Sequence, residues 1–408
     1  MPNDDESARP GLAHTLWRTL PRGPRRAALA RLTASLAPRP GPPPPSRPPG
    51  AAIIGEIGRA SGLGEGARLM AAALAQLGLP APTLTLTPGG HPAPPPPGMP
   101  LIFHVNAPHI AAALLRLPRA WVRGRAVIGY WAWELPTLPP SWRLGVPFVH
   151  QVWVPSRFTQ EALAPLLPGR VHRVPHPLAA VPPRPAPLCR EDFGWPDGAV
   201  VVLAIINLAS SFVRKNPLGA IAAFRAAFAN RADRLLVLKL SGIADFPADF
   251  AKLREAVAGC PNIRIDTRLL PGADLHAMTS AADIVLSLHR SEGFGLVPAQ
   301  AMLLGRAVVA TGWSGNMDFM DSNSAALIGY TLVPARDPRG VFEAPGAVWA
   351  EPDIADAAAA LRHLANDPPA RHALGQAARL SAARALGAEA LARALANLPG
   401  QIVTGGGS

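Results

Sequence analysis

Short apolar runs alternate with longer segments of helical periodicity from about residue 51 onward. Short apolar runs bounded by glycine and proline are typical of buried strands, and the segments between them are long enough to form crossover helices. The alternation therefore predicts two successive β-α-β arrays, which form two parallel sheets covered by helices. The expected strands are AAIIGEI, TLTLT, LIFHVN, RAVIGYW and HQVWVP in the first half, and VVVLAII, RLLVLKL, NIRID, DIVLSL and AVVAT in the second.

Helix signals and proline-rich stretches divide the chain further. Ser156 stands where an N-cap belongs, and Pro217 suits a first helical turn. A continuous helical pattern runs from Asp353 to about Asn397. The proline-rich stretches predict linkers rather than regular structure. The expected organisation is a flexible, basic and proline-rich tail (1–50), a first Rossmann-like domain (51–180), a linker (181–198), a second Rossmann-like domain (199–370), and C-terminal helices and tail (371–408).

Composition excludes some classes of function. The 408 residues contain 39 Lys and Arg against 27 Asp and Glu, a formal charge of +12. This excess suits a phosphate-bearing ligand, an anionic membrane or nucleic acid, or it reflects a GC-rich genome. Nucleic acid is not expected, because no basic stripe carries interleaved aromatic residues. Cys189 and Cys260 lack the spacing of a metal site, so a disulfide scaffold and a zinc site are not expected either.

The same observations predict a location. A chain with two cysteines favours a reducing compartment, which makes the cytoplasm the expected location. No run of 18 apolar residues and no apolar secretory signal is found. The basic segment around Arg25 to Leu36 leaves two interpretations open. It forms a helix that contacts anionic lipid at the inner face of the membrane, or it is a disordered extension.

Two loops at expected strand ends are candidates for binding an anion such as phosphate. Ligands of open parallel sheets bind at the carboxyl ends of strands, near helix N-termini. In GRASGLGEGAR (58–68), Gly62 and Gly64 permit close backbone approach, or they form only a tight turn. In NLASSFVRKNP (207–217), Arg214 and Lys215 form a phosphate clamp, or they are solvated charges.

The third loop, SEGFGLVPAQAM (291–302), places a carboxylate at a strand end. Glu292 precedes Gly293, Phe294 and Gly295, and Gln300 follows within the next helix. A carboxylate there accepts hydrogen bonds from sugar hydroxyls, whereas the alternative is a side chain that caps its own turn. The apolar neighbours would bury the carboxylate, which favours the ligand-binding interpretation.

Five segments, in order, resemble one branch of the retaining glycosyltransferases of family four, which have the two-Rossmann GT-B fold. They are SGLGEGAR, VIGYWAWELPTLPPSW, VWVPSRFTQEAL, SSFVRKNPLGAIAAFRAAF and HRSEGFGLVPAQAMLLGRAVVAT. The resemblance covers roughly residues 51 to 395. It implies two Rossmann-like domains that face a cleft, with C-terminal helices after the second. By the same resemblance, the first domain (51–180) binds the acceptor and the second (199–370) binds the nucleotide sugar.

The resemblance also implies roles for the matched positions. Lys215 stabilises the departing diphosphate, and Arg214 lies beside it as a further donor-binding residue. Glu292 contacts hydroxyls of the donor sugar, and Gln300 takes the place of the second glutamate of the Glu-x7-Glu segment, which holds the ribose. The positions whose backbone approaches the donor are Gly62, Gly64, Gly293, Phe294 and Gly295.

Three positions depart from the family pattern. Ala209 stands where many members carry an arginine, and Gln300 replaces a glutamate. Many members have a histidine after the strand that here reads VIGYW, where this chain offers Trp131, Trp133 and Glu134. Glu134 and Trp133 are therefore acceptor-side candidates, Glu134 as a catalytic one, and both have packing as the alternative. His104, at the end of a neighbouring strand, is a further acceptor-side candidate or a structural histidine.

The implied activity is transfer of a sugar from a nucleotide-diphosphate sugar to a glycan or lipid-linked acceptor. The resemblance implies retention of configuration, no cofactor and no metal ion, in polysaccharide or glycoconjugate synthesis. No Asp-x-Asp pair is present to hold a metal. The alternative is a non-catalytic scaffold or sugar-nucleotide sensor with the same fold, which Ala209 and Gln300 favour. The nucleotide base, the sugar and the acceptor leave no trace in the sequence, although loops such as TRLLPGAD are expected to contact the base.

Overall fold

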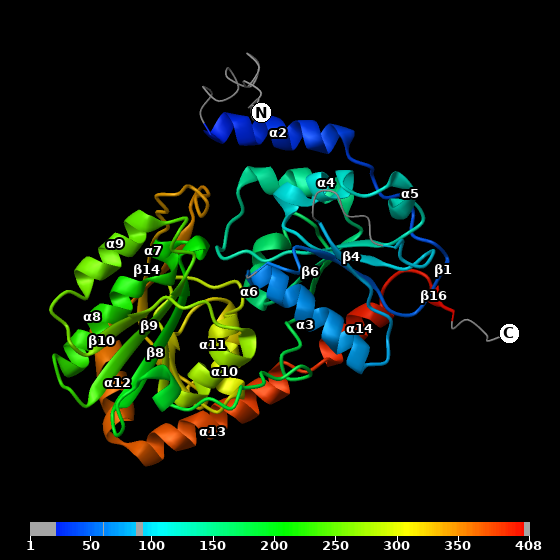
Figure 1. Cartoon of the computed structure of the whole chain (residues 1–408). Coiled ribbons are helices and arrows are strands. Elements are labelled where there is room, and N and C mark those ends of the chain that lie inside the picture. Colours follow the sequence, from blue (N-terminus) through cyan, green and yellow to red (C-terminus); the bar gives the residue numbers. More distant parts are fainter. Residues whose placement is uncertain (1–21, 60, 87–92, 404–408) are drawn as a thin grey trace, which may run out of the picture.

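The computed structural model describes residues 22–59, 61–86 and 93–403. Within them, two six-stranded parallel sheets lie in separate domains (Figure 1). The first sheet has the order β3-β2-β4-β5-β6-β7. Its four inner strands are almost wholly buried, because helices cover the sheet, and this explains their continuous apolar runs. The strands are β2 (Ala52–Gly55), β3 (Thr83–Thr85), β4 (Leu101–His104), β5 (Val127–Tyr130), β6 (Gln151–Val154) and β7 (Val171–Arg173).

Two helices of the first domain begin at a serine side-chain cap. The Ser61 side chain accepts a hydrogen bond from the Gly64 amide, and Ser156 accepts one from Thr159, as its position in the sequence predicts. The helical elements are α2 (Arg22–Leu36), α3 (Gly62–Gln76), α4 (Ala107–Leu115), α5 (Arg119–Val122), the 3-10 segment η1 (Pro140–Phe148) and α6 (Arg157–Leu163).

The second sheet has the order β10-β9-β8-β11-β12-β13. The chain order reverses between β8 and β11, so the two strands are neighbours at a topological switch point, where open sheets bind ligands. The strands are β8 (Val200–Asn207), β9 (Arg234–Ser241), β10 (Ile263–Asp266), β11 (Ile284–Ser287), β12 (Ala307–Thr311) and β13 (Ala326–Ile328).

The C-terminal helical segment that the sequence predicts from Asp353 to about Asn397 consists of three helices. They are separated at Asp367, whose side chain caps the next helix ahead of Pro368, and again between residues 386 and 388. The helical elements from residue 191 onward are η2 (Glu191–Phe193), η3 (Leu208–Ser210), α7 (Phe212–Lys215), α8 (Pro217–Phe228), α9 (Pro247–Ala256), α10 (Gly272–Ala281), α11 (Leu296–Leu303), η4 (Gly315–Asp318), α12 (Ile354–Asn366), α13 (Pro368–Ala385) and α14 (Glu389–Ala396).

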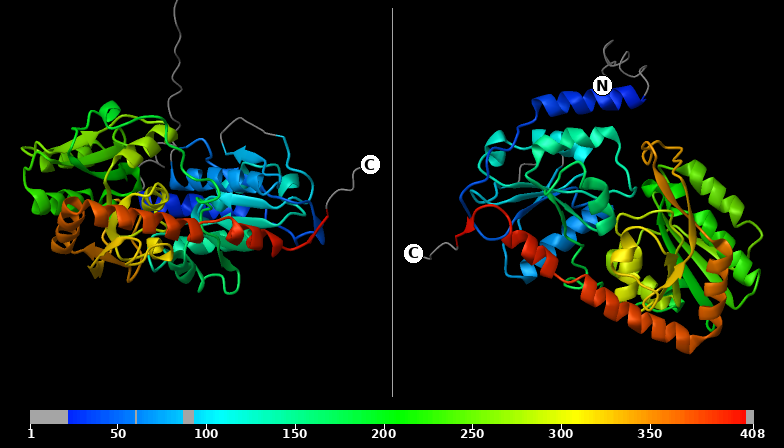
Figure 2. Two further views of the ribbon diagram at one scale, coloured as in Figure 1. Left: turned by 90° about the horizontal axis from the view of Figure 1, so that it is seen from below. Right: turned by 180° about the vertical axis from the view of Figure 1, so that it is seen from behind.

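The C-terminal helices join the two domains. Figures 1 and 2 show α13 running along the second domain and α14 lying against the first. Leu391 and Leu395 of α14 pack in one cluster with Ile53 and Met70 of the first domain. The chain therefore returns to the domain from which it started.

A β-hairpin that the sequence pattern does not indicate also connects the domains. Strands β14 (Tyr330–Pro334) and β15 (Val348–Pro352) pair antiparallel. The loop between them carries Phe342 into the hydrophobic cluster of the first domain, where its ring stacks on Trp133 at 5.5 Å between centroids.

The structure differs from the expected tail within residues 22–50. Helix α2 contacts α4, and β1 (Ser46–Arg47) pairs with β16 (Gln401–Ile402). Arg47 is buried, and its guanidinium donates a hydrogen bond to the Leu395 carbonyl at 2.5 Å. The proline-rich stretch therefore packs along the domain in extended form. Residues 1–21, the remainder of the expected tail, lie outside the described residues.

The expected fold class is confirmed. Each predicted strand of both arrays is present, and all strand pairs of the two large sheets in the described residues are parallel. Among the described residues, no helix combines the length and the apolarity that crossing a membrane requires.

Candidate active site

Two loops meet at the switch point of the second sheet. The first follows β8 and forms η3 and α7, and the second follows β11 and leads into α11. Asn216 adopts a left-handed conformation (φ 50°), caps α8 through its side-chain oxygen, and donates from its side-chain nitrogen to the Leu288 carbonyl at 3.0 Å. Asn216 thus holds the loop that carries Lys215 against the loop that carries Glu292.

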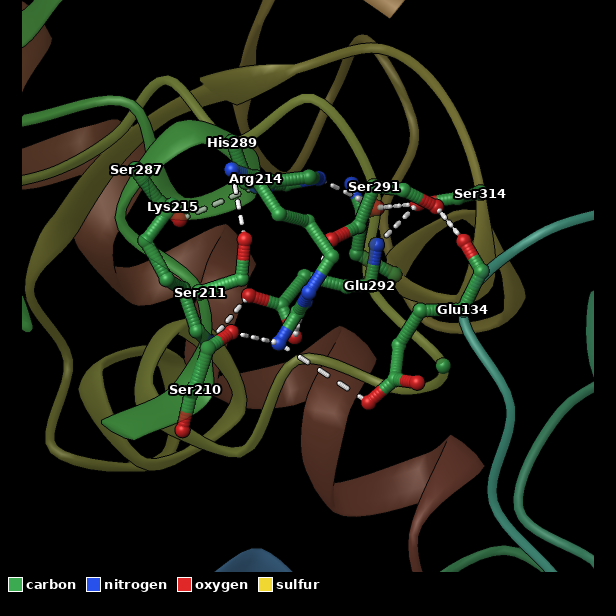
Figure 3. A network of polar contacts seen from close by, with 12 residues as sticks. Glu134, Ser210, Ser211, Arg214, Lys215, Ser287, His289, Ser291, Glu292 and Ser314 are labelled. Atoms are coloured by element: carbon green, nitrogen blue, oxygen red, sulfur yellow. Dashed lines mark hydrogen bonds and ion pairs between the residues drawn. The ribbon is translucent and has the colours of Figure 1, made fainter. Parts of the chain in front are cut away.

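Glu292 lies between two cations. Its Oε1 accepts a hydrogen bond from Lys215 Nζ, and its Oε2 is 3.4 Å from Arg214 Nη1 (Figure 3). The backbone amide of Glu292 donates to Ser314 Oγ at 2.9 Å. Burial by itself raises the pKa of Glu292, but Lys215 and Arg214 outweigh it and lower the pKa to about 2. The side chain is therefore a carboxylate across the physiological pH range.

Arg214 is a buried structural cation of the site. It donates to the carbonyls of Ser291 at 2.7 Å and Ser210 at 2.8 Å, which fixes its guanidinium across both loops. The guanidinium carbon lies 4.9 Å from the centroid of the Phe342 ring, within the range of a cation–π contact. Its Nε has no hydrogen-bond partner among the described residues.

Glu134 reaches the same cluster from the first domain. Its Oε1 is 3.8 Å from Arg214 Nη2, and its backbone carbonyl accepts a hydrogen bond from Ser291 Oγ (Figure 3). Burial raises the pKa of Glu134, with Glu292 adding to the effect and Arg214 opposing it. The structure therefore brings Glu134, Arg214, Lys215 and Glu292 into one charged network that spans both domains.

The glycines around Glu292 allow close approach of backbones. A Cβ on Gly293 would lie 2.9 Å from the Trp133 carbonyl oxygen, and one on Gly315 would lie 2.3 Å from the Gly293 carbonyl oxygen. Gly295 has φ 97° and is the N-cap residue of α11. The Gly293 carbonyl accepts a hydrogen bond from Ser156 Oγ at 2.6 Å. Any larger side chain at 293 would push the two domains apart.

Phe294 is among the residues that line the cleft, and its ring is buried. The ring stands edge-on to His176, with 4.9 Å between centroids, and tilts against Phe319 at 5.0 Å. This hydrophobic packing anchors the turn that precedes α11.

The glycine loop of the first domain faces α11. Gly62 and Gly64 lie in the first turn of α3, and a Cβ on Gly62 would lie 3.8 Å from Leu296 Cδ1 of the second domain. A Cβ on Gly64 would lie 2.6 Å from the Arg59 carbonyl oxygen. The N-termini of α3 and α11 therefore approach each other, and both helix ends favour an anion.

The three remaining candidate residues, Gln300, His104 and Trp133, differ in whether they line the interdomain cleft. Gln300 lines the cleft one turn into α11. His104 borders the cleft, but its ring is buried, stacks on Tyr130 at 4.5 Å and contacts the Met70 sulfur through Nε2. Burial lowers the pKa of His104 well below its ordinary value. Trp133 is buried away from the cleft, with Nε1 donating to the Thr137 carbonyl at 2.8 Å. This placement favours packing, the alternative that the sequence left open, and an acceptor-side role for Trp133 stays a prediction.

A cleft of about 930 Å³ lies between the domains and contains both loops. Leu270 and Gly272 of the TRLLPGAD loop line it. Sequence reasoning assigned no role to several other lining residues, because their side chains meet only in the folded chain. These are Glu56, Arg59, Arg68, Asn106, His109 and Arg116 from the first domain, and Asn207, Ser210, Ser241 and His276 from the second. In the described part of the chain, no group of three or more His, Cys, Asp or Glu side chains has the arrangement of a metal site.

Comparisons with solved structures show the same fold. The crystal structure of Anabaena Alr3699/HepE in complex with UDP-glucose matches with a TM-score of 0.62 and 14% identity, covering 85% of this chain and 98% of that one. Sucrose-phosphate synthase from Thermosynechococcus elongatus matches with 0.59 and 16%, covering 85% and 97%. A glycosyltransferase from Rickettsia africae ESF-5 matches with 0.59 and 12%, covering 85% and 96%.

Comparison of the sequence with family models gives a match within the second domain. No curated protein gives a significant match to the chain. The family model of glycosyl transferases group 1 matches residues 200–367, which contain both the Lys215 loop and the Glu292 loop. The second domain thus carries the sequence pattern of glycosyl transferases group 1, and the chain as a whole has the GT-B fold.

Proposed function

We propose that the protein is a glycosyltransferase that takes a sugar from a nucleotide-diphosphate sugar bound in the interdomain cleft. The observation that carries the proposal is the Lys215–Glu292–Arg214 network at the switch point of the second sheet, within the segment that matches glycosyl transferases group 1. Similar structures support the donor class, since one was solved with UDP-glucose.

Lys215 and the amides at the N-terminus of α11 act on the leaving group. Cleavage of the glycosidic bond to the diphosphate places negative charge on the departing oxygen. A fixed cation and a helix N-terminus that face this position stabilise the transition state more than the ground state. Lys215 is held by Glu292 in this structure, so the incoming diphosphate takes over part of that ion pairing.

Glu292 orients the donor sugar. It is a carboxylate at neutral pH and accepts hydrogen bonds from sugar hydroxyls, while Arg214 keeps its second oxygen in place. Gln300 lies farther along the cleft wall, where it binds the ribose of the donor. Glu134 stands on the opposite wall, and its raised pKa suits a group that exchanges a proton with the acceptor.

The finer features of the reaction belong to the proposal as well. We propose retention of configuration, an acceptor that is a glycan or a lipid-linked intermediate, and a role in polysaccharide or glycoconjugate synthesis. Lys215, Arg214 and two helix N-termini supply the positive charge that the diphosphate needs, so we expect EDTA to leave the rate unchanged. We also propose a cytoplasmic location, because Cys189 and Cys260 are both free thiols.

A second candidate is a non-catalytic nucleotide-sugar sensor. Ala209 supplies no charge at a position where an arginine is expected, and Gln300 lacks the charge of a glutamate. The intact Lys215–Glu292 pair favours catalysis. A sensor binds the donor without releasing nucleoside diphosphate, whereas an enzyme releases it and does so faster with acceptor.

A thermal-shift screen with UDP, GDP and ADP, followed by transfer assays with the nucleotide sugars of the base that binds, tests the proposal. A nucleotide that binds only the folded state raises the melting temperature with its concentration. We expect one base to give a clear shift and Lys215→Ala to weaken it. Absence of a shift with all three nucleotides would contradict the proposed donor class.

A further inference from the structure

Helix α2 presents its large apolar side chains to solvent. Leu29, Leu32 and Leu36 are 53%, 56% and 53% exposed. Their spacing of three and four residues places them on one face of the helix. The small side chains of Ala34 and Ala37 instead pack on the core of the first domain. A helix that only covers a domain buries its leucines, so α2 has the opposite orientation.

Arginine supplies all the charge in the segments around this face. Residues 22–55 contain six arginines and residues 107–133 contain four, and neither segment contains Asp or Glu. Arg31, Arg119 and Arg123 are exposed. Arg119 donates to the Leu36 carbonyl at 3.3 Å, which places α5 beside the C-terminal end of α2. Among the described residues of these two segments, the leucine stripe is therefore bordered by arginine and by no Asp or Glu.

We propose that Leu29, Leu32 and Leu36, together with Arg31, Arg119 and Arg123, form a docking surface for an anionic lipid bilayer. The leucines enter the boundary between headgroups and acyl chains, and the guanidinium groups bind lipid phosphates. A second copy of this chain or another protein would also cover the leucines. The charge of a single sign favours the bilayer, whose surface is uniformly negative.

Helix α2 lies at the outer edge of the first domain in Figures 1 and 2, alongside α4, which it contacts. Helix α4 also carries cleft residues, among them His109 and Ala112. The docking surface therefore lies one helix away from the cleft. The inference is independent of the proposed reaction, because its test measures only binding to lipid.

Vesicle co-sedimentation of the full chain tests the docking surface. The vesicles contain phosphatidylcholine alone or with about one third phosphatidylglycerol, at about 0.1 M and about 1 M salt. The test variant replaces Leu29, Leu32 and Leu36 by glutamine, which has a similar helix propensity. The control replaces three exposed leucines of the second domain, Leu218, Leu269 and Leu380, by glutamine. Two double variants test the contribution of charge: Arg31→Gln/Arg123→Gln at the docking surface, and Arg225→Gln/Arg254→Gln on the second domain as its control.

We expect the wild type to bind the anionic vesicles at low salt and to bind phosphatidylcholine weakly. The α2 leucine variant should lose at least about tenfold in partition coefficient, with unchanged helical circular dichroism, while the second-domain leucine control binds as the wild type does. Arg31→Gln/Arg123→Gln should lower binding more than its control. The proposal is overturned if the wild type does not bind anionic vesicles, or if the α2 leucine variant binds them as well as the wild type does. A wild-type dimer that the leucine variant converts to a monomer would assign the surface to a second copy instead.

Discussion

Glu292→Gln removes the charge that Lys215 and Arg214 share while keeping the size of the side chain. The pKa of Glu292 in the folded protein is about 2, against an ordinary 4.5. One pKa unit corresponds to about 1.4 kcal/mol. The charged carboxylate therefore stabilises the folded state by roughly 3 kcal/mol at neutral pH. The side chain is only 10% exposed, so solvent screening lowers this value little.

The sign of the pH dependence follows from the lowered pKa. The contribution of Glu292 is fully present above its ordinary pKa near 4.5 and is lost as the pH falls toward 2. The difference in unfolding free energy between wild type and Glu292→Gln should be roughly 3 kcal/mol at pH 7 and roughly 1 kcal/mol near pH 3. Turnover should also fall at neutral pH, because the amide orients the sugar less well.

Urea unfolding followed by circular dichroism at pH 7, 4 and 3 measures the difference. Glu351→Gln is the matched control, because Glu351 pairs with Arg290 at 2.6 Å but is 41% exposed. Such a surface pair contributes less than about 1 kcal/mol. Equal stability of Glu292→Gln and wild type at pH 7, or a difference that does not shrink toward pH 3, would refute the assignment of Glu292 as the shared charge.

Three further substitutions test separate parts of the site. Lys215→Ala should lower kcat by on the order of 10²-fold or more, because a preorganised cation at a developing anion is lost; initial rates at the wild-type value would exclude the clamp. Gln300→Ala should raise the donor KM several-fold with a smaller change in kcat, as expected for one neutral hydrogen bond, while Gln300→Glu should keep its turnover; a collapse of kcat in Gln300→Glu would place Gln300 nearer the reacting bond. Gly293→Ala should destabilise the protein by about 1–3 kcal/mol, since its Cβ would lie 2.9 Å from the Trp133 carbonyl oxygen. Urea unfolding measures this effect against the control Gly58→Ala, whose Cβ would meet no atom within 4 Å. Equal unfolding midpoints for the two variants would show that the domains move apart without a cost in stability.

Local signals in the sequence predicted the fold well. Alternating strands and helices fix two parallel sheets, because parallel neighbours need crossover connections. Ser156 caps its helix as expected, since an N-cap depends only on residues three positions away. The Lys215 and Glu292 loops were found because both follow strands, and strand ends of a parallel sheet meet at one edge.

The sequence predicted less where distant segments meet. Phe342 lies on a hairpin loop far from Arg214 in the chain, and the contact between them forms only when this hairpin packs beside the loop that carries Arg214. Trp133 was an acceptor-side candidate because the resemblance implies a histidine after the strand VIGYW, and packing was the alternative. The alternation in WAWE carried the missing signal: Ala132 and Glu134 line the cleft, while Trp131 and Trp133 are buried. Ser46–Arg47, within the expected tail, pairs with Gln401–Ile402 at the other end of the chain, a contact that local sequence signals do not indicate.

The release of nucleoside diphosphate from a panel of UDP-, GDP- and ADP-sugars tests the central claim most directly. The account predicts that one donor releases its diphosphate, faster with a suitable acceptor, and that Lys215→Ala lowers the rate by about 10²-fold or more. The contradicting result is that no donor releases its diphosphate although a nucleotide stabilises the protein against heat. The protein would then bind nucleotides in this cleft without catalysing transfer.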